Sequence, residues 1–217
     1  MKTYRPRTLD PTKILTRREL AAVLAELKRK AVRSRSTRLN LVIFRLACCC
    51  GLRASEIAKL QVADVLVELP RPHLRIRSGA AKGGRPRTVP LWWDGSTLAD
   101  VAAWKQQRLL EGAVAAEAFV ASLRPGRTAG IPLSRHTLRK RFRTACKLLG
   151  RERLASLTIH HGRHTFISHA LAGGRTLAEV RDAAGHSNVS ITSTYLHVVV
   201  EDDEPVGNLF GFAASQP

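Results

Sequence analysis

The sequence is short of acidic residues. Its 217 residues include 36 Lys and Arg but only 17 Asp and Glu, which gives a formal net charge of +19. Solubility requires much less charge, so the excess predicts a polyanionic partner, with nucleic acid favoured over an anionic membrane surface. The length suits one domain with or without a small appendage, and the 44% of apolar residues can build its core.

Long apolar segments are also missing. No uncharged apolar run approaches the roughly 18 residues that a membrane-spanning helix needs. The first residues, MKTYRPRTLDPTK, contain no apolar stretch of the kind found in secretion signals. These absences predict a cytoplasmic protein without a membrane partner.

Cysteine is scarce, and the spacing of the four cysteines fits neither a disulfide-bonded nor a zinc-bound scaffold. Cys48, Cys49 and Cys50 are adjacent and Cys146 stands alone. This pattern is not a disulfide framework, and it lacks the C-x-x-C pairs of a zinc site. We expect reduced thiols, as in the cytoplasm, and no structural metal.

Apolar spacing predicts an α+β fold that is mostly helical. Thr16 followed by Glu19 fits a capping box, and apolar residues with helical spacing come after it. The first 15 residues predict a flexible arm. Residues 112–133 receive no assignment except a loop at 125–126. The other predicted helices cover residues 37–50, 54–60, 96–110, 134–149 and 160–172, a helix that begins at the capping box of Thr176 and Glu179, and residues 190–197.

A small antiparallel sheet is predicted in the middle of the chain. Leu74 and Ile76 alternate with arginines, and residues 88–91 form a second extended segment. The glycine-rich and basic connection at 81–86 predicts a β-hairpin with a basic tip. Pro90 lacks an N–H group, which predicts that its strand lies at an edge of the sheet.

Four short segments carry residue types suited to phosphodiester chemistry. They are G-L-R-A-S-E at 51–56, Lys82 in the hairpin turn, H-H-G-R at 160–163, and G-H at 185–186 with Tyr195 nine residues after the histidine. Each segment alone is weak, but the ordered set resembles the catalytic domain of the tyrosine recombinase (phage integrase) family. The resemblance covers about residues 16–197. It implies a catalytic domain over 16–200 and a C-terminal tail over 201–217.

The resemblance implies that Tyr195 attacks a DNA phosphate and forms a 3′-phosphotyrosine. Such an intermediate keeps the energy of the broken bond, so rejoining needs no ATP. Arg53 and Arg163 match the two family arginines. Their planar guanidinium groups would stabilise the negative charge that develops on the phosphate oxygens.

Other positions complete the implied site. His160 lies one helical turn from Arg163 and is expected to accept the proton of the nucleophile or to hold a phosphate oxygen. His186 would donate a hydrogen bond to the phosphate. Lys82 would protonate the departing 5′ oxygen. Glu56 would orient the first arginine rather than react.

Metal chemistry is the rival interpretation of the histidines. His160 and His164 have the spacing of zinc-protease helices, but the glutamate of H-E-x-x-H is replaced by His161. We therefore expect no metal and no cofactor. The extra histidines, including His169, would pack in the core or lie near the phosphate.

The sequence departs from the family pattern in three places. Gly162 stands where an apolar residue is common, which we expect to loosen a packing contact. Ala184 replaces a common Leu. The residues ahead of the first motif are too few for the separate DNA-clamping domain of many members, so we expect a short single-domain member or an excised domain.

The implied function is a site-specific recombinase or integrase that acts on double-stranded DNA as a tetramer. An apolar patch in the tail would dock on a neighbouring protomer or fold back on its own core; it comprises Val206, Leu209, Phe210 and Phe212. Three alternatives stay open: a catalytically degenerate DNA-binding regulator, a type IB topoisomerase-like relaxing enzyme and, less favoured, a hydrolytic nuclease.

Overall fold

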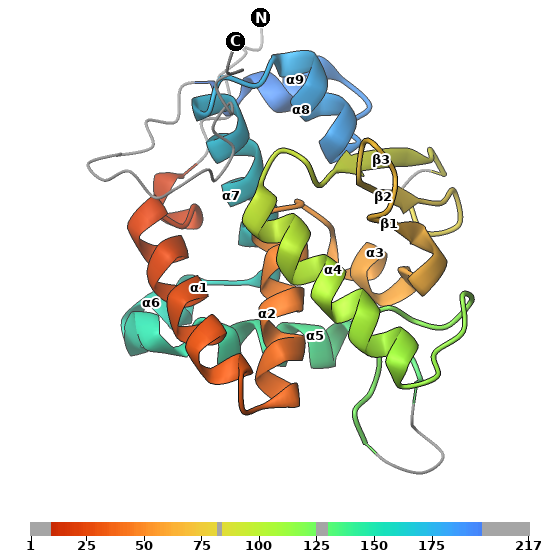
Figure 1. Cartoon of the computed structure of the whole chain (residues 1–217). Helices are drawn as coiled ribbons and strands as arrows, with labels where there is room; N and C mark the ends of the chain where they lie inside the picture. Colours follow the sequence, from red (N-terminus) through yellow and green to blue (C-terminus); the bar gives the residue numbers. More distant parts are fainter. Residues whose placement is uncertain (1–9, 82–83, 125–129, 197–217) are drawn as a thin grey trace, which may run out of the picture.

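A computed structural model describes residues 10–81, 84–124 and 130–196. Helices dominate and a small antiparallel sheet lies to one side of them, which confirms the predicted α+β class (Figure 1). The elements are α1 (Arg17–Ala31), α2 (Arg35–Cys48), α3 (Ala54–Lys59), β1 (Val65–Leu66), β2 (His73–Ile76), β3 (Arg87–Pro90), α4 (Gly95–Leu110), α5 (Arg135–Ala145), α6 (Gly150–Ser156), α7 (Ile159–Ala172), α8 (Leu177–Ala184) and α9 (Val189–Ser193).

Helix α2 is the centre of the molecule. It packs against α1, α4, α5 and α7, and every residue from Leu39 to Cys48 is buried. One of these buried residues is charged. The Arg45 guanidinium donates to Asp94 and Asp100 on the α4 side, at 3.2 and 2.8 Å. This pairing offsets the cost of removing the charge from water.

Several predicted helix starts are confirmed by their caps. The hydroxyl of Thr16 accepts from the Glu19 N–H while the Glu19 carboxylate accepts from the Thr16 N–H, which is the reciprocal pattern of a capping box. Ser134 caps α5 in the predicted place. Helix α4 begins at Gly95, one residue earlier than predicted, with Asp94 as its N-cap.

The sheet has the order β1-β2-β3 within the described residues. Leu74 pairs with Val89, and Pro90 lies on the outer strand β3, as predicted. The pairing of β1 with β2 was not predicted, because two residues carry too little pattern. The arginines of β2 and its end are not free charges, since Arg75 and Arg77 both bind the buried Asp64.

The helix predicted over 134–149 is wrong at its C-terminal end. Helix α5 stops at Ala145, and Gly150, with φ of +86°, redirects the chain into the unpredicted α6. The amphipathic pattern continues across this break, so the spacing of apolar residues alone could not locate it.

Part of the predicted arm packs on the core. Ile14 and Leu15 are buried. The Leu15 N–H donates to Thr165 Oγ1, and its carbonyl lies 2.7 Å from His169 Nε2, both on α7. Residues 1–9 of the arm, Lys82 and the tail over 201–217 lie outside the described residues.

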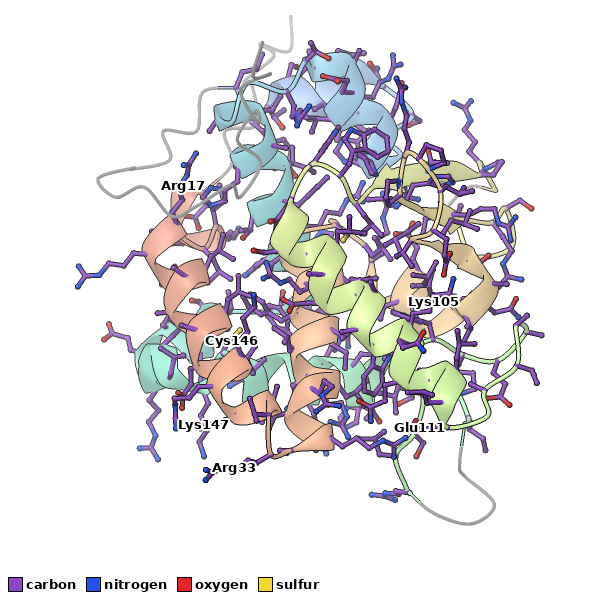
Figure 2. All side chains as sticks on the ribbon, viewed as in Figure 1. Arg17, Arg33, Lys105, Glu111, Cys146 and Lys147 are labelled. Carbon is purple, nitrogen blue, oxygen red and sulfur yellow. The ribbon has the colours of Figure 1, made fainter. Side chains whose placement is uncertain are left out.

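The four cysteines are buried, and burial raises the pKa of each thiol. Figure 2 shows Cys146 among the helices, whereas Arg33 and Lys147 extend at the edge of the molecule. In the part of the chain that the structure describes, no helix is both long and apolar enough to cross a membrane.

Candidate active site

The first site arginine stands where α2 turns into α3. Gly51 has φ of +64°, and a Cβ there would lie 2.4 Å from a ring carbon of Phe166, so only glycine allows this turn. Arg53 is the residue before α3. Its N–H and its Nη1 both donate to the Glu56 carboxylate, at 2.9 and 3.1 Å. One carboxylate therefore binds both the backbone and the side chain of Arg53.

Glu56 is fully buried and serves two arginines. Both terminal nitrogens of Arg87 donate to it, at 2.9 and 2.8 Å. Burial alone would raise the pKa of Glu56, but the hydrogen bonds and charges of Arg87 and Arg53 lower it below its usual value. The predicted orienting role of Glu56 stays a prediction, and its geometry supports it. Arg87 was not predicted, although its sequence place just after the hairpin tip is a usable signal.

Arg163 on α7 is held differently. Its side chain is 2% exposed and donates to the backbone carbonyls of Gly51 and Ala184. Burial, and after it the nearby charge of Arg53, lowers its pKa to about 9. A lowered guanidinium pKa means that the charge is poorly compensated. An anion at this position would be strongly favoured.

Gly162 brings α7 close to α2. A Cβ on this glycine would lie 3.0 Å from the carbonyl carbon and from the Cβ of Ala47. The expectation that Gly162 loosens the packing is therefore wrong. Its missing side chain is what allows the helix that carries His160 and Arg163 to lie against the central helix.

Tyr195 follows α9 and points back to α7. It is 6% exposed, and its Oη lies 2.6 Å from Nδ1 of His164. Burial raises the pKa of the phenol, while the charges of Arg163 and Arg53 act against that rise. The motif alone does not assign His164 to the site, although it follows the motif arginine directly.

His186 reaches the same place from the end of α8. Gly185, with φ of +67°, ends that helix, and a Cβ there would lie 2.7 Å from the Arg87 side chain. The His186 ring lies 6.5 Å from the Tyr195 ring, and its Nδ1 lies 2.9 Å from Thr192 Oγ1. Burial and the neighbouring guanidinium groups lower its pKa to about 3, so the ring is neutral at pH 7.

Two clefts meet at Arg53. The first, of about 510 Å³, is also lined by His160 and by the arginine row of α5, which comprises Arg135, Arg139 and Arg143. The second, of about 980 Å³, runs between β3 and the α8–α9 region, and its basic lining includes Arg85, Arg87 and Arg181 beside His186. An extended polyanion could follow both clefts and place one phosphate at the arginine they share.

Five of the six predicted catalytic residues thus come together. Arg53, His160, Arg163, His186 and Tyr195 surround one position, although they come from separate parts of the chain. Lys82, the sixth, lies outside the described residues. Among the residues that the structure describes, no group of three or more His, Cys, Asp or Glu side chains is arranged to hold a metal ion.

Comparison with known families decides the assignment. Residues 13–201 match the model of the phage integrase family. The chain belongs to this family. Its sequence is also similar to the tyrosine recombinase XerC of Rhodospirillum centenum, with 32% identity over 91% of this chain and 51% of that protein. The tyrosine recombinase XerA of Pyrococcus furiosus is 26% identical over 90% of this chain and 60% of that protein.

Solved structures show the same fold. A XerA recombinase aligns with a TM-score of 0.64 at 20% identity, over 91% of this chain and 62% of that chain. XerH bound to its difH substrate in a pre-cleavage complex also has a TM-score of 0.64, at 20% identity, over 88% of this chain and 51% of that chain. The chain therefore has the tyrosine recombinase catalytic-domain fold, and it spans about half to three fifths of the length of these relatives.

Proposed function

We propose that this protein is a site-specific DNA recombinase or integrase that cleaves and rejoins DNA through a 3′-phosphotyrosine. The observation that carries the proposal is the Tyr195 hydroxyl, buried beside Arg163 and close to the charge of Arg53. A phenol among poorly compensated cations suits attack on a phosphodiester, because the cations stabilise the charge that develops.

Each residue has a step in this reaction. Arg53 and Arg163 hold the nonbridging oxygens of the scissile phosphate. His186, whose ring is neutral, donates a hydrogen bond to the same phosphate. Tyr195 gives up its hydroxyl proton, for which the resemblance offers His160 as acceptor, and bonds to phosphorus. The 5′ oxygen leaves with a proton from Lys82, a role that also rests on the family resemblance. Rejoining reverses these steps. It needs no ATP, since the phosphotyrosine keeps the bond energy, and no metal, since the arginines stabilise the charge on the phosphate.

Double-stranded DNA is the proposed partner, and the net charge of +19 supports it. The two basic clefts on either side of Arg53 would track the backbone, so binding should weaken steeply with salt. We also propose a homotetramer on paired DNA sites, as the resemblance implies. An enzyme of this kind, with four buried thiols, would act in the cytoplasm.

The test uses duplex DNA from the native flanking sequence, nicked near the expected cleavage point so that the covalent complex accumulates. We expect a protein–DNA band with the wild-type protein and none with Tyr195→Phe, which keeps the ring but loses the nucleophilic oxygen. A band that persists in Tyr195→Phe would refute the nucleophile. Absence of a band on every flanking sequence would favour the regulator, and relaxation without recombination of paired sites would favour the topoisomerase-like enzyme.

A further inference from the structure

A histidine outside the expected set holds the Tyr195 hydroxyl. Tyr195 Oη lies 2.6 Å from His164 Nδ1, and the two rings lie 5.7 Å apart at an angle of 29°. His164 follows Arg163 directly on α7, so one helix carries both groups. Because the phenol is buried, water competes poorly for this hydrogen bond.

The protonation states make the hydroxyl the donor. Burial, and after it the neighbouring His160 and His161 rings and the Arg163 guanidinium, lowers the pKa of His164 to about 4. Its ring is therefore neutral at pH 7 and has one nitrogen with a free lone pair. Burial raises the pKa of Tyr195 above its usual value, so the phenol is protonated at pH 7. The phenol therefore keeps a proton that His164 can receive.

We propose that His164 is a further catalytic residue of the cleavage reaction, in which its Nδ1 aims the Tyr195 oxygen and takes its proton during attack. The inference rests on the proposed function. The Tyr195 O–H bond breaks as an N–H bond forms on His164. The phenol oxygen bonds to phosphorus, the bond to the 5′ oxygen breaks, and that oxygen takes a proton from Lys82. On rejoining, His164 returns its proton to the phenol.

This assignment separates two roles that the sequence offered to His160 together. His160 lies one turn before His164, with the rings 4.8 Å apart and nearly perpendicular, and it lines the cleft shared by Arg53 and the α5 arginines. That place suits the holding of a phosphate oxygen. The proton acceptor is the ring in hydrogen-bond contact with the phenol. An entering phosphate adds negative charge, which makes a proton on His164 more acceptable as attack proceeds.

The first experiment measures the rate of covalent complex formation on the nicked duplex for three variants. His164→Leu should lower this rate by about 10²-fold, because leucine can neither orient the Tyr195 hydroxyl nor accept its proton. His164→Asn places an amide oxygen near the position of Nδ1, so it should orient the Tyr195 hydroxyl without accepting its proton. Its rate should lie between those of His164→Leu and the wild-type protein. His73→Asn, at a histidine on β2 that lines neither cleft, should leave the rate unchanged. All three should bind the DNA and unfold at wild-type denaturant concentrations.

The second experiment replaces the departing 5′ oxygen by sulfur, which leaves without a proton. This substrate should restore cleavage by Lys82→Ala but not by His164→Leu, because His164 acts on the nucleophile. Cleavage by folded His164→Leu or His164→Asn at the wild-type rate, or rescue of either by the sulfur substrate, would overturn the proposal. If even the wild-type protein forms no complex, the proposed function fails first and the His164 role fails with it.

Discussion

The two arginines of the site are held in opposite ways. Arg53 binds a fully buried carboxylate, Glu56, which Arg87 also binds with two nitrogens. Arg163 is itself almost fully buried, and it donates to the carbonyls of Gly51 and Ala184. Both positions hold an arginine, yet only the first includes a countercharge.

The two arginines therefore differ in the source of the negative charge that balances them. In the Arg53 region the Glu56 carboxylate binds two guanidinium groups and compensates part of their charge, so the protein itself fixes the geometry there. In the Arg163 region the cation has a pKa of about 9, because burial and Arg53 act against its charge. That region is completed by negative charge from outside, which we propose is the scissile phosphate.

The largest expected effect comes from removal of the internal countercharge. Glu56→Gln should lower the free energy of unfolding by roughly 3–5 kcal/mol, since Arg87 and Arg53 would keep buried charges without a carboxylate. Urea denaturation measures it. The matched control is Glu68→Gln, which removes an exposed carboxylate bound to Lys105 and should change stability by less than about 0.5 kcal/mol. A loss below about 1 kcal/mol for Glu56→Gln would break the comparison.

Removal of the uncompensated cation should affect activity more than stability. Arg163→Met should slow covalent complex formation by roughly 10²–10³-fold, because a donor to the developing charge is lost. Its stability loss should stay below that of Glu56→Gln, since the relief of a buried charge offsets two lost hydrogen bonds. Arg33→Met, at the exposed edge seen in Figure 2, is the control for both measurements. A larger stability loss for Arg163→Met would reverse the comparison.

Lowering the pH should reduce the free energy of unfolding, because the histidines near Arg163 resist protonation in the folded protein. The folded pKa values of His164 and His186 are about 4 and about 3, below the unfolded value near 6.5. Between those values the unfolded chain binds protons that the folded chain does not. The histidine contribution is therefore complete above pH 6.5 and is lost as pH falls, by about 1.4 kcal/mol per pH unit for each histidine.

Urea midpoints between pH 7 and pH 5 test this expectation. His186→Asn should flatten the slope, because one of the two depressed groups is gone. The window lies above the usual carboxylate range, so the slope reports histidines. Equal stability at pH 7 and pH 5 would show that burial and the Arg163 charge do not lower the pKa values of these histidines.

The smallest expected effect concerns the tautomer of His186. The hydroxyl of the buried Thr192 lies 2.9 Å from His186 Nδ1, and its donation there would leave the ring proton on Nε2 for the phosphate. Thr192→Val should lower the cleavage rate roughly 5- to 10-fold, the worth of about 1 kcal/mol for one hydrogen bond. Thr192→Ser keeps the donor and should retain the rate. Equal rates in Val and Ser would remove Thr192 from the site.

Much of the local structure could be predicted because its causes are local. The capping boxes of α1 and α8 and the edge position of Pro90 each depend on residues within a few places of one another. The break between α5 and α6 could not be predicted, because apolar residues on both sides continue one pattern. The burial of Leu15 was missed since its partners on α7 lie about 150 residues away.

By itself the sequence determined which residue types the proposed site contains and in what order, because a motif records side chains at fixed spacings. Only the tertiary structure decided how each is held. The contacts of a residue depend on its neighbours in space. Only the folded structure therefore showed three of them: Arg87 with Glu56, Gly162 with Ala47, and His164 with Tyr195. The same physical cause separates the two arginines: burial and countercharge belong to the packed surroundings, and identical side chains acquire different electrostatics there.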